Sequence, residues 1–81
     1  MGEYGERFNA AVAAELRAQR ARGDKITFDR IAVETGLSKS AVLNYFHGHR
    51  DIPLPALAEI CRVLRVSRRD IFEAAERSIE G

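Results

Sequence analysis

Apolar residues recur at helical spacing along this chain, and they do so first over residues 5–22. There Phe8, Val12 and Leu16 stand four residues apart in a stretch rich in alanine and arginine, and Gly23 follows. This spacing places the apolar side chains on one face of an α-helix, which a glycine can end. The two-residue period of a half-buried strand never persists. The pattern therefore predicts an all-α protein.

Four shorter helices are predicted after Gly23, over residues 28–35, 38–47, about 53–64 and 68–80. Each begins at a residue type that suits a helix N-terminus, because Ser and Thr accept a hydrogen bond from a free backbone N–H and proline has no N–H to leave unpaired. These residues are Thr27, Ser38, Pro53, Pro55 and Ser67, the last in a candidate capping box with Asp70. The residues expected to face inward on the last four helices include Val42, Tyr45, Phe46, Leu57, Ile60, Cys61, Leu64, Ile71 and Phe72.

Length and composition limit the chain to one compact domain over residues 1–81. Of its 81 residues 46% are apolar and 31% charged, without an apolar run long enough to span a bilayer, which is typical of a globular protein that folds in water. The N-terminus resembles neither a secretory signal nor a complete myristoylation motif, so a cytoplasmic location is expected. The single cysteine, Cys61, stands in an apolar stripe and is predicted to be a buried thiol.

The charge is distributed unevenly, although the net charge is only +1. Basic residues predominate from Gly36 to Arg69, and acidic residues predominate after Arg69. This polarity is expected if one face of the molecule meets phosphates. The basic residues concerned are Lys39, Arg50, Arg62, Arg65, Arg68 and Arg69, against Asp51 and Glu59.

The two short helices on either side of Thr35-Gly36-Leu37-Ser38 carry the functional signal. A helix-turn-helix requires a small residue where the two helices approach and a glycine where the chain turns with positive φ. Ala32 and Gly36 occupy these places, four residues apart. The sequence therefore predicts a helix-turn-helix core over residues 27–48.

The run ITFDRIAVETGLSKSAVLNYFHGHRDIPLPALAEICRVLRVSRRDIFEAA resembles the Xre or lambda-repressor-like helix-turn-helix family. The resemblance extends from about Phe8 to Phe72 and is strongest from Thr27 to Arg50. It implies a compact five-helix domain that binds double-stranded DNA sequence-specifically, without a cofactor. It also implies a transcriptional regulator, with a repressor on a palindromic operator as the leading interpretation.

By this resemblance, residues 38–47 are the recognition helix, which lies in the major groove. Lys39 is then expected to donate to guanine and Asn44 to pair with adenine, while Ser40 can donate or accept and Leu43 can cover a thymine methyl. Backbone phosphates are the expected partners of six residues, of which Arg50 has the guanidinium fork that best suits a phosphate. These six are Ser38, His47, His49, Arg50, Arg22 and Lys25. A metal site at His47 and His49 lacks further His or Cys ligands and is not expected.

Three departures from the family pattern are visible. Phe28 and Asp29 stand where many relatives have a glutamine that holds a phosphate and supports the recognition helix. The link over residues 23–26 is longer than usual. Arg65 replaces the glycine that commonly ends the fourth helix. Because an arginine in the left-handed conformation costs about 1 kcal/mol, a different ending is expected for that helix.

A single small domain reads few base pairs, so a homodimer is expected, at least on DNA. The last helix, over residues 68–80, is the candidate for dimerisation, because Ala75 and Ile79 extend its apolar stripe beyond the expected core. The alternative is that Ile79 packs on the first helix near Phe8.

Catalysis is not expected, because the sequence has no phosphate-binding glycine loop, metal cluster or nucleophile with a base at a recognisable spacing. Two alternatives to a stand-alone repressor remain. One is an antitoxin that binds its own operator and a toxin, and the other is a protein-interaction module that keeps the fold without binding DNA.

Overall fold

The computed structural model describes residues 2–23 and 25–81, which form five helices. These are α1 (Glu3–Arg22), α2 (Phe28–Thr35), α3 (Lys39–Phe46), α4 (Leu54–Leu64) and α5 (Arg68–Glu80). None of the described residues lies in a strand, so the predicted all-α, five-helix class is confirmed. The expected long link after Gly23 includes Asp24, which lies outside the described residues.

The predicted N-caps form. The side-chain oxygen of Thr27 accepts from the Arg30 backbone N–H at 3.1 Å, and that of Ser38 accepts from the Ala41 N–H at 3.0 Å. Ser38 is therefore the N-cap, as predicted, and α3 begins at the next residue, Lys39. The side-chain oxygen of Ser67 accepts from the backbone N–H of Arg69 at 3.1 Å. In a capping box it would accept from the backbone N–H of Asp70 instead.

The expectation that α4 avoids a left-handed ending at Arg65 is wrong. Arg65 has φ 60° and ψ 42°. Its N–H donates to the Arg62 carbonyl at 3.2 Å, and the N–H of Val66 donates to the Cys61 carbonyl at 3.0 Å. These two bonds form a Schellman motif, which satisfies carbonyls that the helix end would otherwise leave unpaired and offsets the cost of an arginine at this position.

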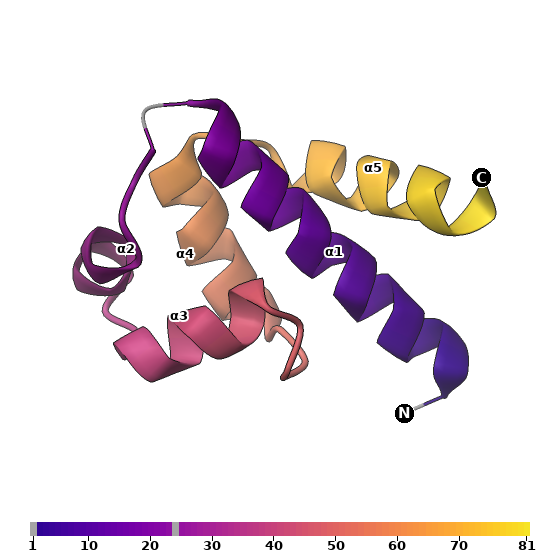
Figure 1. The fold of residues 1–81 in the computed structure, drawn as a ribbon, viewed down its shortest axis with the longest axis horizontal. Coiled ribbons are helices and arrows are strands. Elements are labelled where there is room, and N and C mark those ends of the chain that lie inside the picture. Colours follow the sequence, from indigo (N-terminus) through magenta and orange to yellow (C-terminus); the bar gives the residue numbers. More distant parts are fainter. Residues whose placement is uncertain (1, 24) are drawn as a thin grey trace.

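The helices pack around one core, with α1 in the middle. Figure 1 shows α5 on one side of α1 and α2, α3 and α4 on the other, with α4 packed mainly against α2. The largest fully buried side chains are Phe46, Leu16, Ile31, Leu57, Ile60, Ile71, Val42 and Cys61. Cys61 is 1% exposed, as predicted, and burial raises the pKa of its thiol, an effect that the nearby Arg68 charge opposes.

The prediction that Ala75 contributes to a dimer surface is wrong, because Ala75 is fully buried in the monomer core. The reason is that α5 lies against α1, with the rings of Phe8 and Phe72 5.6 Å apart. Ile79 is half-buried, and its carbonyl accepts a hydrogen bond from Arg7 of α1 at 3.4 Å. The apolar stripe of α5 is therefore used mainly within one copy of the chain. In the described part of the chain, no helix combines the length and hydropathy needed to cross a membrane.

Candidate nucleic-acid interface

The turn between α2 and α3 is fixed by local hydrogen bonds. The Thr35 hydroxyl donates to the Ile31 carbonyl at 2.7 Å and accepts from the Leu37 N–H at 3.2 Å. Gly36 has φ 77°, and its N–H donates to the Ala32 carbonyl at 3.0 Å. A Cβ at residue 36 would meet no atom within 4 Å, so the turn needs glycine for its backbone conformation and not for space.

One face of α3 belongs to the core and the other is turned outward. Val42, Tyr45 and Phe46 are buried, as the sequence predicts. At about 100° per residue, the four predicted base readers, Lys39, Ser40, Leu43 and Asn44, and the predicted phosphate contact His47 lie on one continuous face of the helix. Of these, Lys39, Ser40 and His47 are exposed, whereas Leu43 and Asn44 are half-buried.

The N-terminal end of α3 carries an ion pair with α2. The ammonium nitrogen of Lys39 lies 3.0 Å from a carboxylate oxygen of Asp29, and both side chains are mostly exposed. An exposed pair contributes little stability, about 0 to 1 kcal/mol. Its significance is instead positional, since Asp29 limits the directions that the predicted base-reading ammonium can take.

The C-terminal end of α3 is held by α1 and α2. Arg17 of α1 donates to the Phe46 carbonyl at 2.6 Å, which places a cation at the negative end of the helix. The Phe28 ring packs edge-on against Phe46, with centroids 5.2 Å apart, and the guanidinium carbon of Arg20 lies 3.9 Å from the Phe28 centroid. Phe28 thus supports the recognition helix by packing, at the place where many relatives use a glutamine.

The loop after α3 is anchored by a single asparagine of α1. The Asn9 amide donates to the Arg50 carbonyl at 2.9 Å and accepts from the Ile52 N–H at 3.0 Å. Gly48, at φ 73°, begins this loop, and the backbone N–H of His49 donates to the Asn44 carbonyl at 2.9 Å. The side chains of His49 and Arg50 are exposed beside the end of α3, where they are available to a phosphate.

Asn9, Arg17, Arg20 and Asp29 were missed as supporting residues by the sequence analysis. Only for Asn9 did the sequence contain a weak signal, a polar residue on an otherwise apolar helix face. Asn9 lies three residues before Val12 and four before Ala13, and both are buried. For Arg17 and Arg20 there was no signal, because their acceptors are the main-chain carbonyls of Phe46 and Ile26, and any residue type has such a carbonyl.

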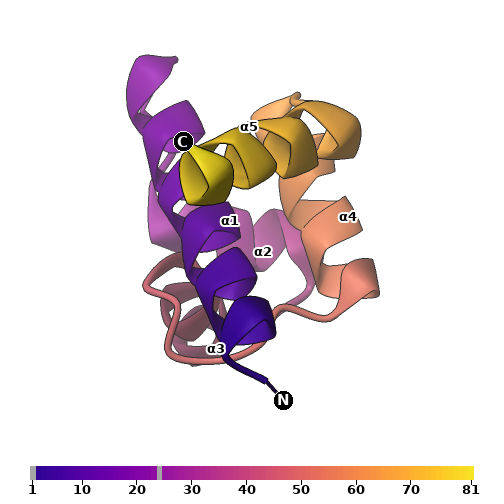
Figure 2. The same cartoon turned by 90° about the vertical axis from the view of Figure 1, so that its right-hand side faces the viewer.

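The structure does not bring Arg22 and Lys25 to the outward face of α3. Arg22 is the last residue of α1, and Figures 1 and 2 both place this end of α1 at the opposite end of the molecule from α3. Gly23, next to Arg22, lines a hollow with Leu64 and Arg65 at the end of α4. The contact of Arg22 and Lys25 with the DNA backbone stays a prediction.

The basic half of the sequence is also divided between two regions. Lys39 and Arg50 flank α3, whereas Arg65, Arg68 and Arg69 lie where α4 ends and α5 begins. His47 and His49 have ring centroids 6.0 Å apart, and among the described residues no group of three or more His, Cys, Asp or Glu could hold a metal ion.

Comparison with known proteins agrees with this geometry. The model of a helix-turn-helix domain family matches residues 11–74. The chain belongs to this family. The crystal structure of the clp gene regulator ClgR from C. glutamicum is similar, with a TM-score of 0.78, 25% sequence identity, and coverage of 88% of this chain and 91% of that chain. A search of curated proteins found no match. The chain is thus a helix-turn-helix domain of the lambda-repressor-like kind, the fold and family of a DNA-binding transcription regulator.

Proposed function

We propose that this chain is a transcriptional repressor that binds a palindromic operator sequence-specifically, with α3 in the major groove. The observation that carries the proposal is the division of α3 into a buried face and an outward face. The outward face presents residue types that hydrogen-bond base edges. Both ends of the helix are held by other elements, so these side chains are preorganised.

Each outward residue has a distinct role in this proposal. Lys39 donates to guanine O6 and N7, Asn44 pairs with adenine N6 and N7, and Leu43 covers a thymine methyl. Ser40 completes the base-reading set as donor or acceptor. Four residues at the two ends of α3 contact the sugar-phosphate backbone, namely Ser38, His47, His49 and Arg50, and these contacts fix the register of α3 in the groove.

The proposed repressor binds its operator as a homodimer, through a surface other than the predicted stripe of α5. An apolar groove of about 220 Å³, whose lining includes Phe8, Ile52, Leu54 and Phe72, lies beside the loop that leaves α3. Leu54 is 66% exposed at this groove, and Tyr4, one helical turn before Phe8, is 58% exposed. A protruding apolar side chain next to an apolar groove supports self-complementary pairing, as a two-fold interface requires.

Selection of binding sites from a pool of random DNA duplexes tests the proposed function without knowledge of the operator. We expect enrichment of a two-fold symmetric motif, with half-site centres about 10 base pairs apart. A pool that remains unenriched after repeated rounds would contradict sequence-specific binding, and an enriched motif without symmetry would contradict the dimer.

A further inference from the structure

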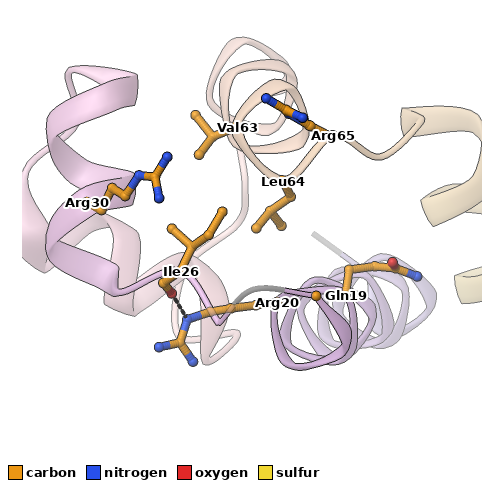
Figure 3. A pocket seen from close by; sticks show the side chains of 8 residues that line it. Gln19, Arg20, Ile26, Arg30, Val63, Leu64 and Arg65 are labelled. Atoms are coloured by element: carbon orange, nitrogen blue, oxygen red, sulfur yellow. Dashed lines mark hydrogen bonds between the residues drawn. The ribbon is translucent and has the colours of Figure 1, made fainter.

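We propose that a second site, separated from α3 by Phe28 of α2, binds a small organic anion. The site is a hollow of about 320 Å³ between the end of α1, the start of α2 and the end of α4 (Figure 3). Its volume is at the lower end of the range for small-molecule sites, about 300 to 1,000 Å³. We call it the arginine hollow, after Arg20, Arg30 and Arg65, which line it.

The lining of the arginine hollow fits a molecule with one charged and one apolar part. Ile26, Val63 and Leu64 supply an apolar surface, and Figure 3 shows the Arg30 and Arg65 side chains on either side of Val63. The described residues that line the hollow include no carboxylate, although Arg30 is ion-paired with Glu34 outside the lining, so Arg65 supplies the main free charge. A phosphate or carboxylate joined to an aliphatic or aromatic body matches this combination, because guanidinium groups favour these anions.

Arg65 supplies the guanidinium that is free to bind an anion. Its backbone is left-handed, with φ 60°, a conformation that glycine adopts without cost. Within the described part of the chain, its exposed guanidinium forms no hydrogen bond or ion pair. An unpartnered guanidinium therefore lies at the edge of the hollow, where it is available to an anion.

The arginine hollow is connected to the recognition helix through Arg20. The Nε of Arg20 donates to the Ile26 carbonyl at 2.6 Å, and its guanidinium lies over Phe28. The Phe28 ring in turn packs on Phe46 and lies 6.2 Å from the ring of His47, at the end of α3. An anion that draws the Arg20 guanidinium away from Phe28 would loosen this support and weaken DNA binding. This regulatory step rests on the proposed function, whereas the anion site itself does not.

Titration of the DNA-free protein with phenyl phosphate, followed by ¹⁵N–¹H NMR at constant ionic strength, tests the site. Inorganic phosphate and phenol are the control ligands. Inorganic phosphate has only the charged part of phenyl phosphate, and phenol has only its apolar part. We expect saturable shifts at the backbone amides of Ile26, Leu64 and Arg65, with at least a fivefold lower Kd for phenyl phosphate than for either part. Shifts that do not saturate, or equal Kd values for phenyl phosphate and inorganic phosphate, would overturn the proposal.

Two matched variants separate the site from general charge effects. Arg65→Gly removes the guanidinium and suits the left-handed backbone, so the fold is kept while the Kd for phenyl phosphate rises at least fivefold. Arg77→Ala removes the same charge on α5, outside the hollow, and should leave the Kd unchanged. Equal effects of the two variants would mean that only net charge matters, and the proposed site would be wrong.

A phosphate of the DNA backbone is the other possible partner of Arg65. The salt dependence of DNA binding distinguishes this partner from a small organic anion. Because the hollow lies away from α3, Arg65→Gly should leave the salt slope of binding unchanged. A slope reduced by about one unit would assign this guanidinium to a DNA phosphate and overturn the proposal. Phenyl phosphate should weaken DNA binding by the wild-type chain and not by Arg65→Gly. Equal weakening of both would overturn the regulatory step.

Discussion

Asn44 is the residue with the most specific proposed role, since its amide can pair with both hydrogen-bonding groups of adenine. It is half-buried on the outward face of α3, in the turn of helix that also carries Leu43. Asn44→Ala should weaken binding to the selected operator by about 1 to 3 kcal/mol and relax preference at one or two base pairs, because only the bidentate contact to adenine is lost. Binding to non-specific DNA, measured by fluorescence anisotropy at the same salt concentration, should barely change. A parallel loss of both affinities would show that Asn44 does not read a base.

Asp29 places a negative charge beside the predicted base-reading lysine, 3.0 Å from its ammonium. Asp29→Asn removes this charge and releases Lys39. We expect tighter binding to all duplexes, a salt slope steeper by up to about one unit, and weaker discrimination at the base pair that Lys39 reads. In a Lys39→Ala background, Asp29→Asn should no longer affect that discrimination. If discrimination falls equally in both backgrounds, the ion pair does not position Lys39.

At the scale of the helices, the turn of the helix-turn-helix depends on one glycine. Gly36→Ala should lower the free energy of unfolding by about 1 to 2 kcal/mol, because alanine is strained at the φ of 77° found there. Gly23→Ala is the matched control, since Gly23 has φ −98° and a Cβ there would meet no atom within 4 Å. Urea denaturation of both variants measures the difference. Equal stabilities would contradict the conformational explanation.

The elements themselves were predictable because their signals are local. Thr27, Ser38 and Ser67 cap helices through bonds to N–H groups two or three residues away, and Gly36 takes the positive φ that the sequence indicated. The ending of α4 was not predictable from the cost at Arg65 alone. It depends on two hydrogen bonds that form together in the Schellman motif.

For the whole molecule, the less predictable features were those that depend on which elements meet. Charge polarity along the chain did not indicate that Arg65 and Arg68 lie away from α3, because α4 carries the chain from one end of the molecule to the other. Likewise, the stripe of Ala75 and Ile79 was correctly identified as apolar, but its partner is α1. The buried face of α3 was predicted correctly, because a single helix determines it, whereas the DNA contacts of its outward face stay predictions.

The proposed dimer surface can be tested with two exposed apolar residues. The wild-type chain should bind a duplex with two half-sites more tightly than a duplex with one. Leu54→Glu, in the apolar groove, should reduce this affinity ratio at least tenfold, because a carboxylate would be buried at the interface. Binding to a single half-site should remain. Val33→Glu is the matched control, since Val33 is 82% exposed on α2, outside the groove. Retained two-site affinity in Leu54→Glu, measured by anisotropy and sedimentation, would place the dimer elsewhere.

The central claim is that this chain recognises a DNA sequence through α3, and the ratio of two affinities tests it most directly. The wild-type chain should be titrated at physiological salt against the selected duplex and against a duplex of the same composition in scrambled order. We predict that the selected duplex binds at least about 10³-fold more tightly, as is usual for specific regulators. A ratio near one would contradict the claim and would favour a protein-interaction module that has kept the helix-turn-helix fold.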